Sequence, residues 1–187
     1  MLGCYDFCGY YEATFQWLED RGGKELLHEY WVEAISKDSQ SHARDLIIGK
    51  GADGMMEYWG HTLSEESPDQ GFTMDRDGDV VRIDMHDCPS KGFLIRNGLE
   101  QHRDYCDHCL GWIGPLMKDA GHVVHHEHNH HGRCWWEFHK AGNPSPPSEV
   151  GKFAKKDVRL APDWKEHTGE VDGFFYAQSV LEKKPES

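Results

Sequence analysis

Residues 105–138 read YCDHCLGWIGPLMKDAGHVVHHEHNHHGRCWWEF and hold three of the chain's six cysteines and seven of its 14 histidines. The apolar run in this segment predicts a helix from about Leu99 to Ala120, with Gly121 as its C-cap. The alternation that follows predicts a strand over residues 122–130, a turn at His131-Gly132 and a second strand over residues 133–138. Thiols and imidazoles are good ligands for borderline-soft metals, so the segment also predicts a metal site inside a fold.

Upstream of this segment, apolar residues recur at every second position. Residues 72–74 and 80–85 predict a hairpin around the turn at residues 75–79. Further towards the N-terminus, apolar residues recur at three and four positions over residues 9–37 and 42–60, which predicts helices. Glycines at positions 22 and 23 interrupt the first helix, and those at 49, 51 and 54 leave open whether the second is two short helices.

This order of elements favours an α+β fold, with N-terminal helices followed by a β-β-α-β-β unit that forms an antiparallel sheet. We expect one α+β domain over residues 1–140, with its helical part at 1–60 and its sheet-containing part at 61–140. A Pro/Ser-rich stretch over residues 141–150 predicts a linker, and the mostly polar remainder to residue 187 predicts a C-terminal tail.

Composition excludes several classes of partner. The formal net charge of −13 argues against binding to nucleic acid and to anionic membrane surfaces. No apolar run approaches the ~18 residues that a membrane span needs, and the N-terminus lacks the pattern of a secretory signal. We therefore expect a cytoplasmic protein with free or metal-bound thiols. The apolar faces of the N-terminal helices leave room for a homodimer.

The cysteines are the first group of candidate metal ligands. Cys106 and Cys109 are three residues apart on the predicted helix, so their side chains share one face. With Cys88 and Cys134 they would supply the four thiolates of a tetrahedral zinc site. Two other interpretations stay open, because free cysteines are common in cores and a Cys-x-x-Cys pair is also typical of redox proteins.

The histidine-rich strand supplies further candidates. Its alternation places Val124 and the histidines at 126, 128 and 130 on one face, and the residue Glu127 on the other. One or two of Glu127, His128 and His130 would complete a metal site with Cys134, unless the strand is simply solvated. Outside the strand, His61, His86 and His102 are candidate general bases or hydrogen-bond donors, and the alternative for each is an ordinary surface or core histidine.

The same residues carry a resemblance to known families. The Cys106–Cys109 motif, the apolar helix, the strand with Glu127 and the closing Gly132-x-Cys134-x-x-x-Phe138 resemble the core of the 4-vinyl reductase domain. The Cys88-Pro89 step before this block also looks like the family named for L-2-amino-thiazoline-4-carboxylic acid hydrolase. The resemblance covers roughly residues 55–140 and rests on short motifs.

The resemblance implies a small-molecule ligand and a zinc site built from Cys106 or Cys109 with Glu127 and Cys134. This sequence departs from the pattern at His130, where relatives of the vinyl reductase domain that sense aromatic compounds have a cysteine. The segment before Cys134 is also shorter. Because histidine also binds zinc, the departure leaves open whether the site is kept with a changed ligand or lost.

Three functional hypotheses follow from these residues. The first is a metal-dependent, hydrolase-like enzyme that acts on a small organic molecule, with zinc as the expected metal and iron as the alternative. The second is a small-molecule-binding sensor module with a structural zinc site. The third and weakest is a thiol redox protein that uses Cys106 and Cys109. In all three the expected partner is a small molecule.

Overall fold

The structure, a computed structural model, describes residues 4–66, 71–142, 145–153 and 156–164. Helices come first along the chain: α1 (Cys4–Glu29), the π-type helix η1 (Tyr30–Ser39), α2 (Ser41–Lys50) and α3 (Ala52–Glu66). The sheet-containing part follows, as β1 (Phe72–Asp77), β2 (Val80–Met85), α4 (Lys91–Arg96), α5 (Asp107–Asp119), β3 (His122–His128) and β4 (Cys134–Lys140), with the short 3-10 helix η2 (Val158–Leu160) after it. This order confirms the predicted α+β fold.

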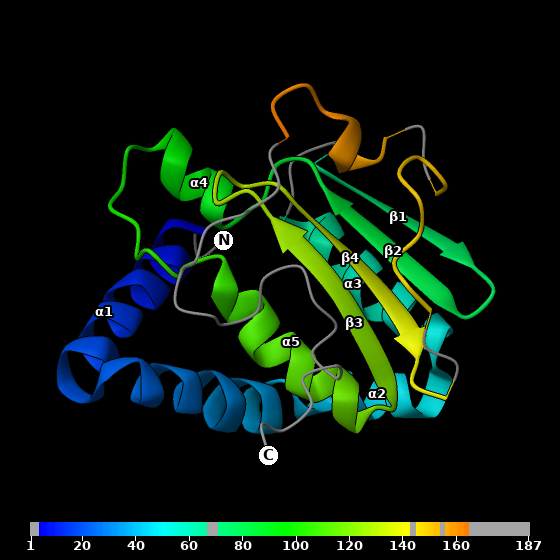
Figure 1. Ribbon diagram of the computed structural model, residues 1–187. Coiled ribbons are helices and arrows are strands. Elements are labelled where there is room, and N and C mark those ends of the chain that lie inside the picture. The colour runs from blue at the N-terminus through cyan, green and yellow to red at the C-terminus, as the bar shows by residue number, and fades with distance from the viewer. Residues whose placement is uncertain (1–3, 67–70, 143–144, 154–155, 165–187) are drawn as a thin grey trace, which may run out of the picture.

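The four strands form one antiparallel sheet in the order β1-β2-β4-β3 (Figure 1). The hairpin β1–β2 turns at Gly78, whose φ of 61° suits glycine. The two hairpins meet where β2 pairs with β4, and α4 and α5 lie in the connection between them. Strand β4 therefore lies inside the sheet, between β2 and β3.

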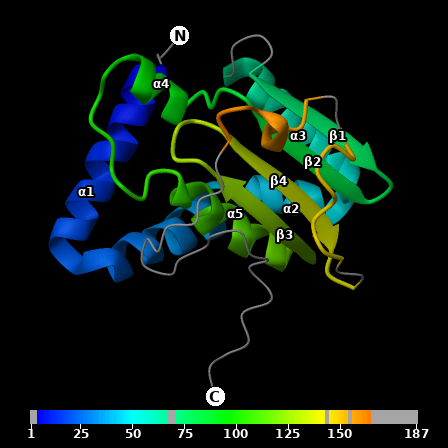
Figure 2. The same ribbon diagram turned by 45° about the horizontal axis from the view of Figure 1, so that its top comes forward.

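One face of the sheet is covered by helices (Figure 2). The main core lies between this face and α2, α3 and α5, and the side chain of Trp59 stacks on that of Phe138 with ring centroids 4.7 Å apart. A second core joins α1 and η1 to the region of α4 and Tyr105, around the fully buried rings of Phe15 and Trp31. None of the helices in the described ranges combines the length and the apolar character that a membrane span needs.

Glycines set several boundaries of the helices. Gly23, with a φ of 70°, kinks α1 where the sequence predicted an interruption. Gly51, with a φ of 58°, separates α2 from α3, so the predicted second helix is two short helices. The helix expected from Leu99 begins only at Asp107, which corrects its start. The preceding residues form turns, closed by hydrogen bonds from the Tyr105 and Asp107 N–H groups to the His102 and Asp104 carbonyls, and the His102 N–H donates to the Glu12 carboxylate.

The other face of the sheet carries charged residues, and residues 145–153 and 156–164 lie against it. Arg82, Asp84 and Glu137 are at most 1% exposed, and Asp157 from this segment lies 3.2 Å from the Arg82 guanidinium. Residues 145–153 and 156–164 of the expected linker and tail therefore pack on the sheet, and the rest of the expected tail, from residue 165, lies outside the described residues. The physical reason is that buried charges need partners, and this segment supplies them.

Candidate metal centre

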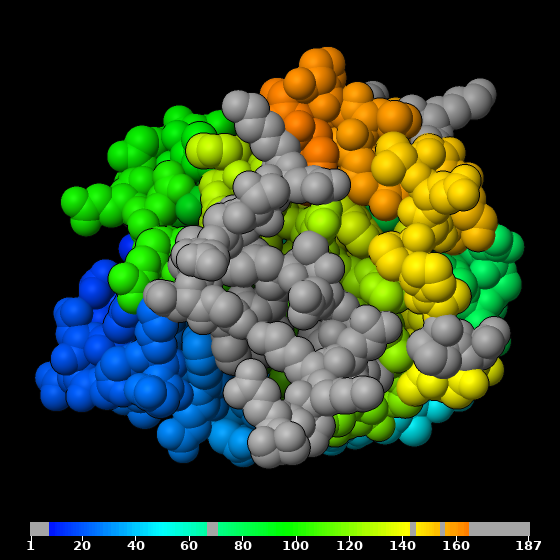
Figure 3. All heavy atoms as spheres, viewed as in Figure 1, coloured from blue at the N-terminus to red at the C-terminus, as the bar shows by residue number. Residues whose placement is uncertain are grey.

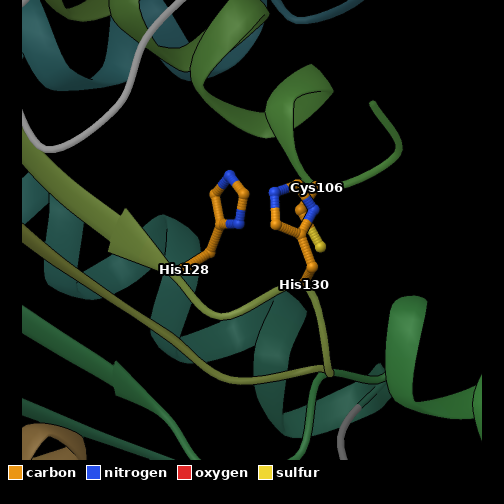
Figure 4. Close-up of side chains that lie close together, drawn as sticks. All are labelled: Cys106, His128 and His130. Carbon is orange, nitrogen blue, oxygen red and sulfur yellow. The ribbon is translucent and has the colours of Figure 1, made fainter. Parts of the chain in front are cut away.

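Three potential metal ligands converge at one end of α5. The Cys106 thiol and one ring nitrogen each of His128 and His130 all lie within 4.8 Å of one another. Figure 4 shows the three side chains gathered between the start of α5 and the end of β3. The ligands of a tetrahedral zinc ion lie roughly 3–4 Å apart, so small side-chain rotations would bring all three onto one ion.

Each ligand comes from a different local structure. Cys106 is the N-cap residue of α5, and the preceding turn is closed by the hydrogen bond from the Asp107 N–H to the Asp104 carbonyl. His128 is the last residue of β3 and pairs with Cys134 across the sheet, on the face that the helices cover. His130 lies in the turn between β3 and β4. The site therefore forms only when α5 packs beside this hairpin.

His130 has a backbone conformation that few non-glycine residues adopt, with a φ of 57°. Asn129 enforces it, because its side-chain oxygen accepts the N–H groups of His131 and Arg133, at 2.8 and 3.1 Å. Such asparagine turns end strands and tolerate left-handed backbone. The strand expected up to residue 130 therefore ends at His128, and the turn brings the His130 ring to 4.2 Å from that of His128, measured between centroids.

Asp107 is the hydrogen-bond partner of the second potential ligand, His128. Its carboxylate lies 2.9 Å from Nε2 of His128, and both side chains are buried. Metal-binding histidines usually make such a hydrogen bond with their other nitrogen, which fixes the ring and raises its basicity. With Nε2 turned to Asp107, the ring would meet a metal ion through Nδ1. Sequence reasoning missed Asp107, although it stands directly beside Cys106.

The remaining cysteines of the predicted set lie around this group. The backbone N–H of Cys88 donates to the Gly132 carbonyl at 2.8 Å, which ties Cys88 to the turn that carries His130. Burial raises the pKa of the thiols of Cys88, Cys106, Cys109 and Cys134, and charge on Cys88 would raise that of the other three further. These thiols are therefore neutral unless a cation is bound, since a bound metal ion lowers the pKa of a thiol.

Glu127 lies on the sheet face opposite to the ligand group. Its carboxylate accepts a hydrogen bond from Trp135 Nε1 at 3.2 Å, and in the sheet it pairs with Trp135 while His128 pairs with Cys134. Of the predicted ligands, the structure thus brings Cys106 and His130 together, with His128 in the place that the resemblance implied for Glu127. The alternation of side chains along the strand indicates this difference, because it puts His128 and His130 on one face and Glu127 on the other.

The three histidines predicted to move protons lie in separate places. His61 is exposed on α3, 3.7 Å from Glu65. His102 is buried against α1, with Nε2 2.7 Å from the Glu19 carboxylate. His86 follows β2 with Thr73 Oγ1 3.4 Å from its ring, and burial lowers its pKa. None of these described partners belongs to the group of three ligands, and the catalytic roles of the three histidines stay predictions.

Comparisons of this chain with family models, with curated proteins and with solved structures found no match. The resemblance to the 4-vinyl reductase domain and to the thiazoline-carboxylate hydrolase family therefore stays a prediction.

Proposed function

We propose that the protein is a metal-dependent, hydrolase-like enzyme acting on a small organic molecule, with zinc bound by Cys106, His128 and His130. The observation that carries the proposal is the convergence of one thiol and two imidazoles within 4.8 Å. Thiolate and imidazole together favour zinc, with iron as the next choice, over magnesium or calcium. Three protein ligands are the usual number in catalytic zinc sites, which keep the fourth position for water or substrate.

The surroundings of the site support this proposal. A zinc ion held in this way lowers the pKa of bound water to about 7 and polarises substrate oxygens. The ligand His128 and its hydrogen-bond partner Asp107 form the carboxylate–histidine pair common at such sites, and Asp107 keeps the ring in one orientation. The Lys91 ammonium lowers the pKa of Cys106, although burial raises it more, and so favours the thiolate that a metal requires.

A second candidate, the small-molecule-binding module with a structural zinc, is favoured by the neighbouring thiols. Cys88, Cys109 and Cys134 lie within electrostatic range of one another, and all three lie within electrostatic range of Cys106. If one of them supplied a fourth ligand, the site would be closed to water and substrate. The third hypothesis, a thiol redox protein, is disfavoured because burial raises the pKa of both Cys106 and Cys109, whereas reactive thiols have a lowered pKa.

Metal analysis of the purified full-length chain tests the site itself. We expect one zinc ion per chain, lost in Cys106→Ala, His128→Gln and His130→Asn, and retained in the matched control His131→Asn. His131 is an exposed histidine in the same turn. A chain that binds no stoichiometric zinc or iron, or that keeps its metal in Cys106→Ala, would overturn the proposal.

Cobalt substitution separates the enzyme from the structural-zinc alternative. In an open site, azide adds to cobalt and changes its visible spectrum, whereas a site closed by a fourth thiolate leaves the spectrum unchanged. A closed site also loses part of its sulfur-to-cobalt absorption in one of Cys88→Ser, Cys109→Ser or Cys134→Ser. In an open site only Cys106→Ser removes that absorption, and this result would favour the hydrolase.

A further inference from the structure

A second group of reactive residues lies on the opposite face of the sheet from the metal ligands. The hydroxyl of Ser145 lies 2.8 Å from Nδ1 of His139, and Nε2 of His139 lies 3.0 Å from the carboxylate of Glu137. A serine, a histidine that can take its proton and a carboxylate that orients the histidine are the components of a nucleophilic hydrolase site. We propose that Ser145 is an acyl-accepting nucleophile in such a site, with His139 as its base and Glu137 as the positioning residue.

Glu137 is suited to hold the histidine. Its side chain is 0% exposed, and it also accepts hydrogen bonds from the Ser148 N–H and from Arg82, both at 3.0 Å. Burial alone would raise its pKa, but the hydrogen bonds from His139 and Ser148 and the charge of Arg82 lower it to about 2. The carboxylate is therefore ionised at neutral pH and stabilises a proton on His139 when one arrives.

His139 is held in the tautomer that the reaction needs. An ionised carboxylate accepts only, so Nε2 of His139 carries the hydrogen and Nδ1 accepts the Ser145 O–H. In the best-known serine hydrolases the two ring nitrogens have the opposite roles, but either nitrogen can take a proton. The ring of His125 meets that of His139 edge-on at 5.0 Å, and its Nε2 lies 2.9 Å from the Ser145 carbonyl. This contact fixes the backbone of the nucleophile.

The nucleophile is accessible although its base is not. Ser145 is exposed, whereas His139 is 3% exposed and Glu137 is fully buried. Figure 3 shows the residues that follow Ser145, in yellow to orange, on the molecular surface. Pro146 and Pro147 come directly after Ser145, and a residue before proline is restricted to extended conformations. Ser145 is thus an exposed residue beside a buried base.

The ligand class is a small carboxylic ester or another activated acyl compound. Ser145 Oγ would attack the acyl carbon while its proton passes to His139 Nδ1. The bond to the leaving alcohol then breaks, and this alcohol takes the proton from His139, leaving an acyl group on Ser145. Water, deprotonated by the same nitrogen, releases the acid and restores the serine. No metal takes part, because the three residues lie on the sheet face opposite to the helix-covered one.

A fluorophosphonate probe, which phosphonylates activated serines with loss of fluoride, tests the proposal on the full-length chain. We expect one adduct, located at Ser145 by peptide mass spectrometry, absent in Ser145→Ala and present in Ser64→Ala. Ser64 is the control because it is an exposed serine on α3, outside this group. A chain that is not labelled, or one labelled equally in Ser145→Ala, would overturn the proposal.

The rate of labelling tests the roles of His139 and Glu137. Its dependence on pH should follow a single ionisation that disappears in His139→Gln, and this variant should slow labelling by about 10²–10⁴-fold. Glu137→Gln should move this pH profile to lower pH, because the imidazolium loses its stabilising charge. If a variant fails to fold by circular dichroism, the profile of the native chain decides: a rate simply proportional to hydroxide would contradict the proposal. A chelator should leave labelling unchanged, so the outcome is independent of the metal centre.

Discussion

His130 is both a strained residue of the β3–β4 turn and a candidate metal ligand. A non-glycine residue with positive φ costs about 1 kcal/mol or more, and such residues gather at functional sites. Here the cost is offset by the two N–H groups that Asn129 binds. The conformation brings the imidazole of His130 beside Cys106 and His128, which an extended residue at this position would not do.

Asp107→Asn tests how the second ligand is oriented. The amide keeps the size of the side chain but loses the charge that supports Nε2 of His128. We expect zinc affinity to fall by about 10–100-fold, measured by competition with a chelator of known affinity. Asp119→Asn, at the exposed end of the same helix, is the control and should bind zinc as the native chain does. Equal affinities in both variants would show that Asp107 does not orient a ligand.

Among the helices, the contact between α5 and η1 sets where Cys106 lies. Gly111 is the residue of α5 that faces Trp31, and a Cβ atom there would lie 2.5 Å from the indole ring. Trp31 is 0% exposed and packs edge-on against Phe15, with ring centroids 5.6 Å apart. The indole therefore has little freedom to move away. The position of α5, which begins directly after Cys106, therefore depends on Gly111 having no side chain.

Gly111→Ala should consequently destabilise the protein, by about 1–3 kcal/mol, because α5 must move away from Trp31. Gly60→Ala is the matched control, since Gly60 is also inside a helix and a Cβ atom there meets nothing within 4 Å. That control should stabilise the protein by about 0.5–1 kcal/mol through helix propensity. Denaturant unfolding measures both. Stabilisation by Gly111→Ala would mean that the close approach is not rigid.

For the molecule as a whole, the sheet separates an apolar layer from a charged one. The helices cover one face, and on the other Arg82 is surrounded by Asp84, Glu137 and Asp157. Trp135 lies under two guanidinium groups, those of Arg82 and Arg159, at 4.5 and 4.8 Å. Such a buried cluster is stable only while its carboxylates stay ionised and paired with the guanidinium groups, so it makes the stability of the fold depend on pH.

Acid should unfold the protein through this charged layer. Burial raises the pKa of Glu137 and Asp157, but hydrogen bonds and Arg82 lower each to about 2, from ordinary values of 4.5 and 3.8. Because the folded pKa is depressed, the unfolded chain binds more protons at acid pH. The stabilisation is complete above about pH 5 and is lost as the pH falls from about 4.5 to about 2, on the order of 2 kcal/mol for each carboxylate.

Urea unfolding over this pH range measures the effect. Glu137→Gln removes one of the two groups, so its free energy of unfolding should fall less steeply between about pH 5 and about pH 3 than that of the native chain. Glu149→Gln, an exposed acid of the covering segment, is the control and should retain the full slope. If Glu137→Gln has the same slope as this control, the charged layer does not govern acid unfolding.

Some of this protein was readable from local sequence alone. Helix and strand periods, the hairpin around residues 75–79 and the glycine interruptions predicted the order of the elements and the α+β fold, because these signals depend on neighbours a few residues apart. Cys106 and His130 were named as metal ligands from their chemistry and spacing. The sequence also predicted which residues of β3 share a face, since side chains alternate on any strand.

Only the tertiary structure decided which of these side chains meet. It joined Cys106 to His128 and His130, separated Glu127 from them, and placed His61, His86 and His102 with other partners. It also places the Ser145 hydroxyl beside the His139 ring, although the prolines around Ser145 predicted only a linker. The physical reason is that these contacts join elements that are distant in the chain. They depend on the packing of α5 and on the need of the buried Glu137 and Arg82 side chains for partners. Neither of these two causes leaves a pattern in the local sequence.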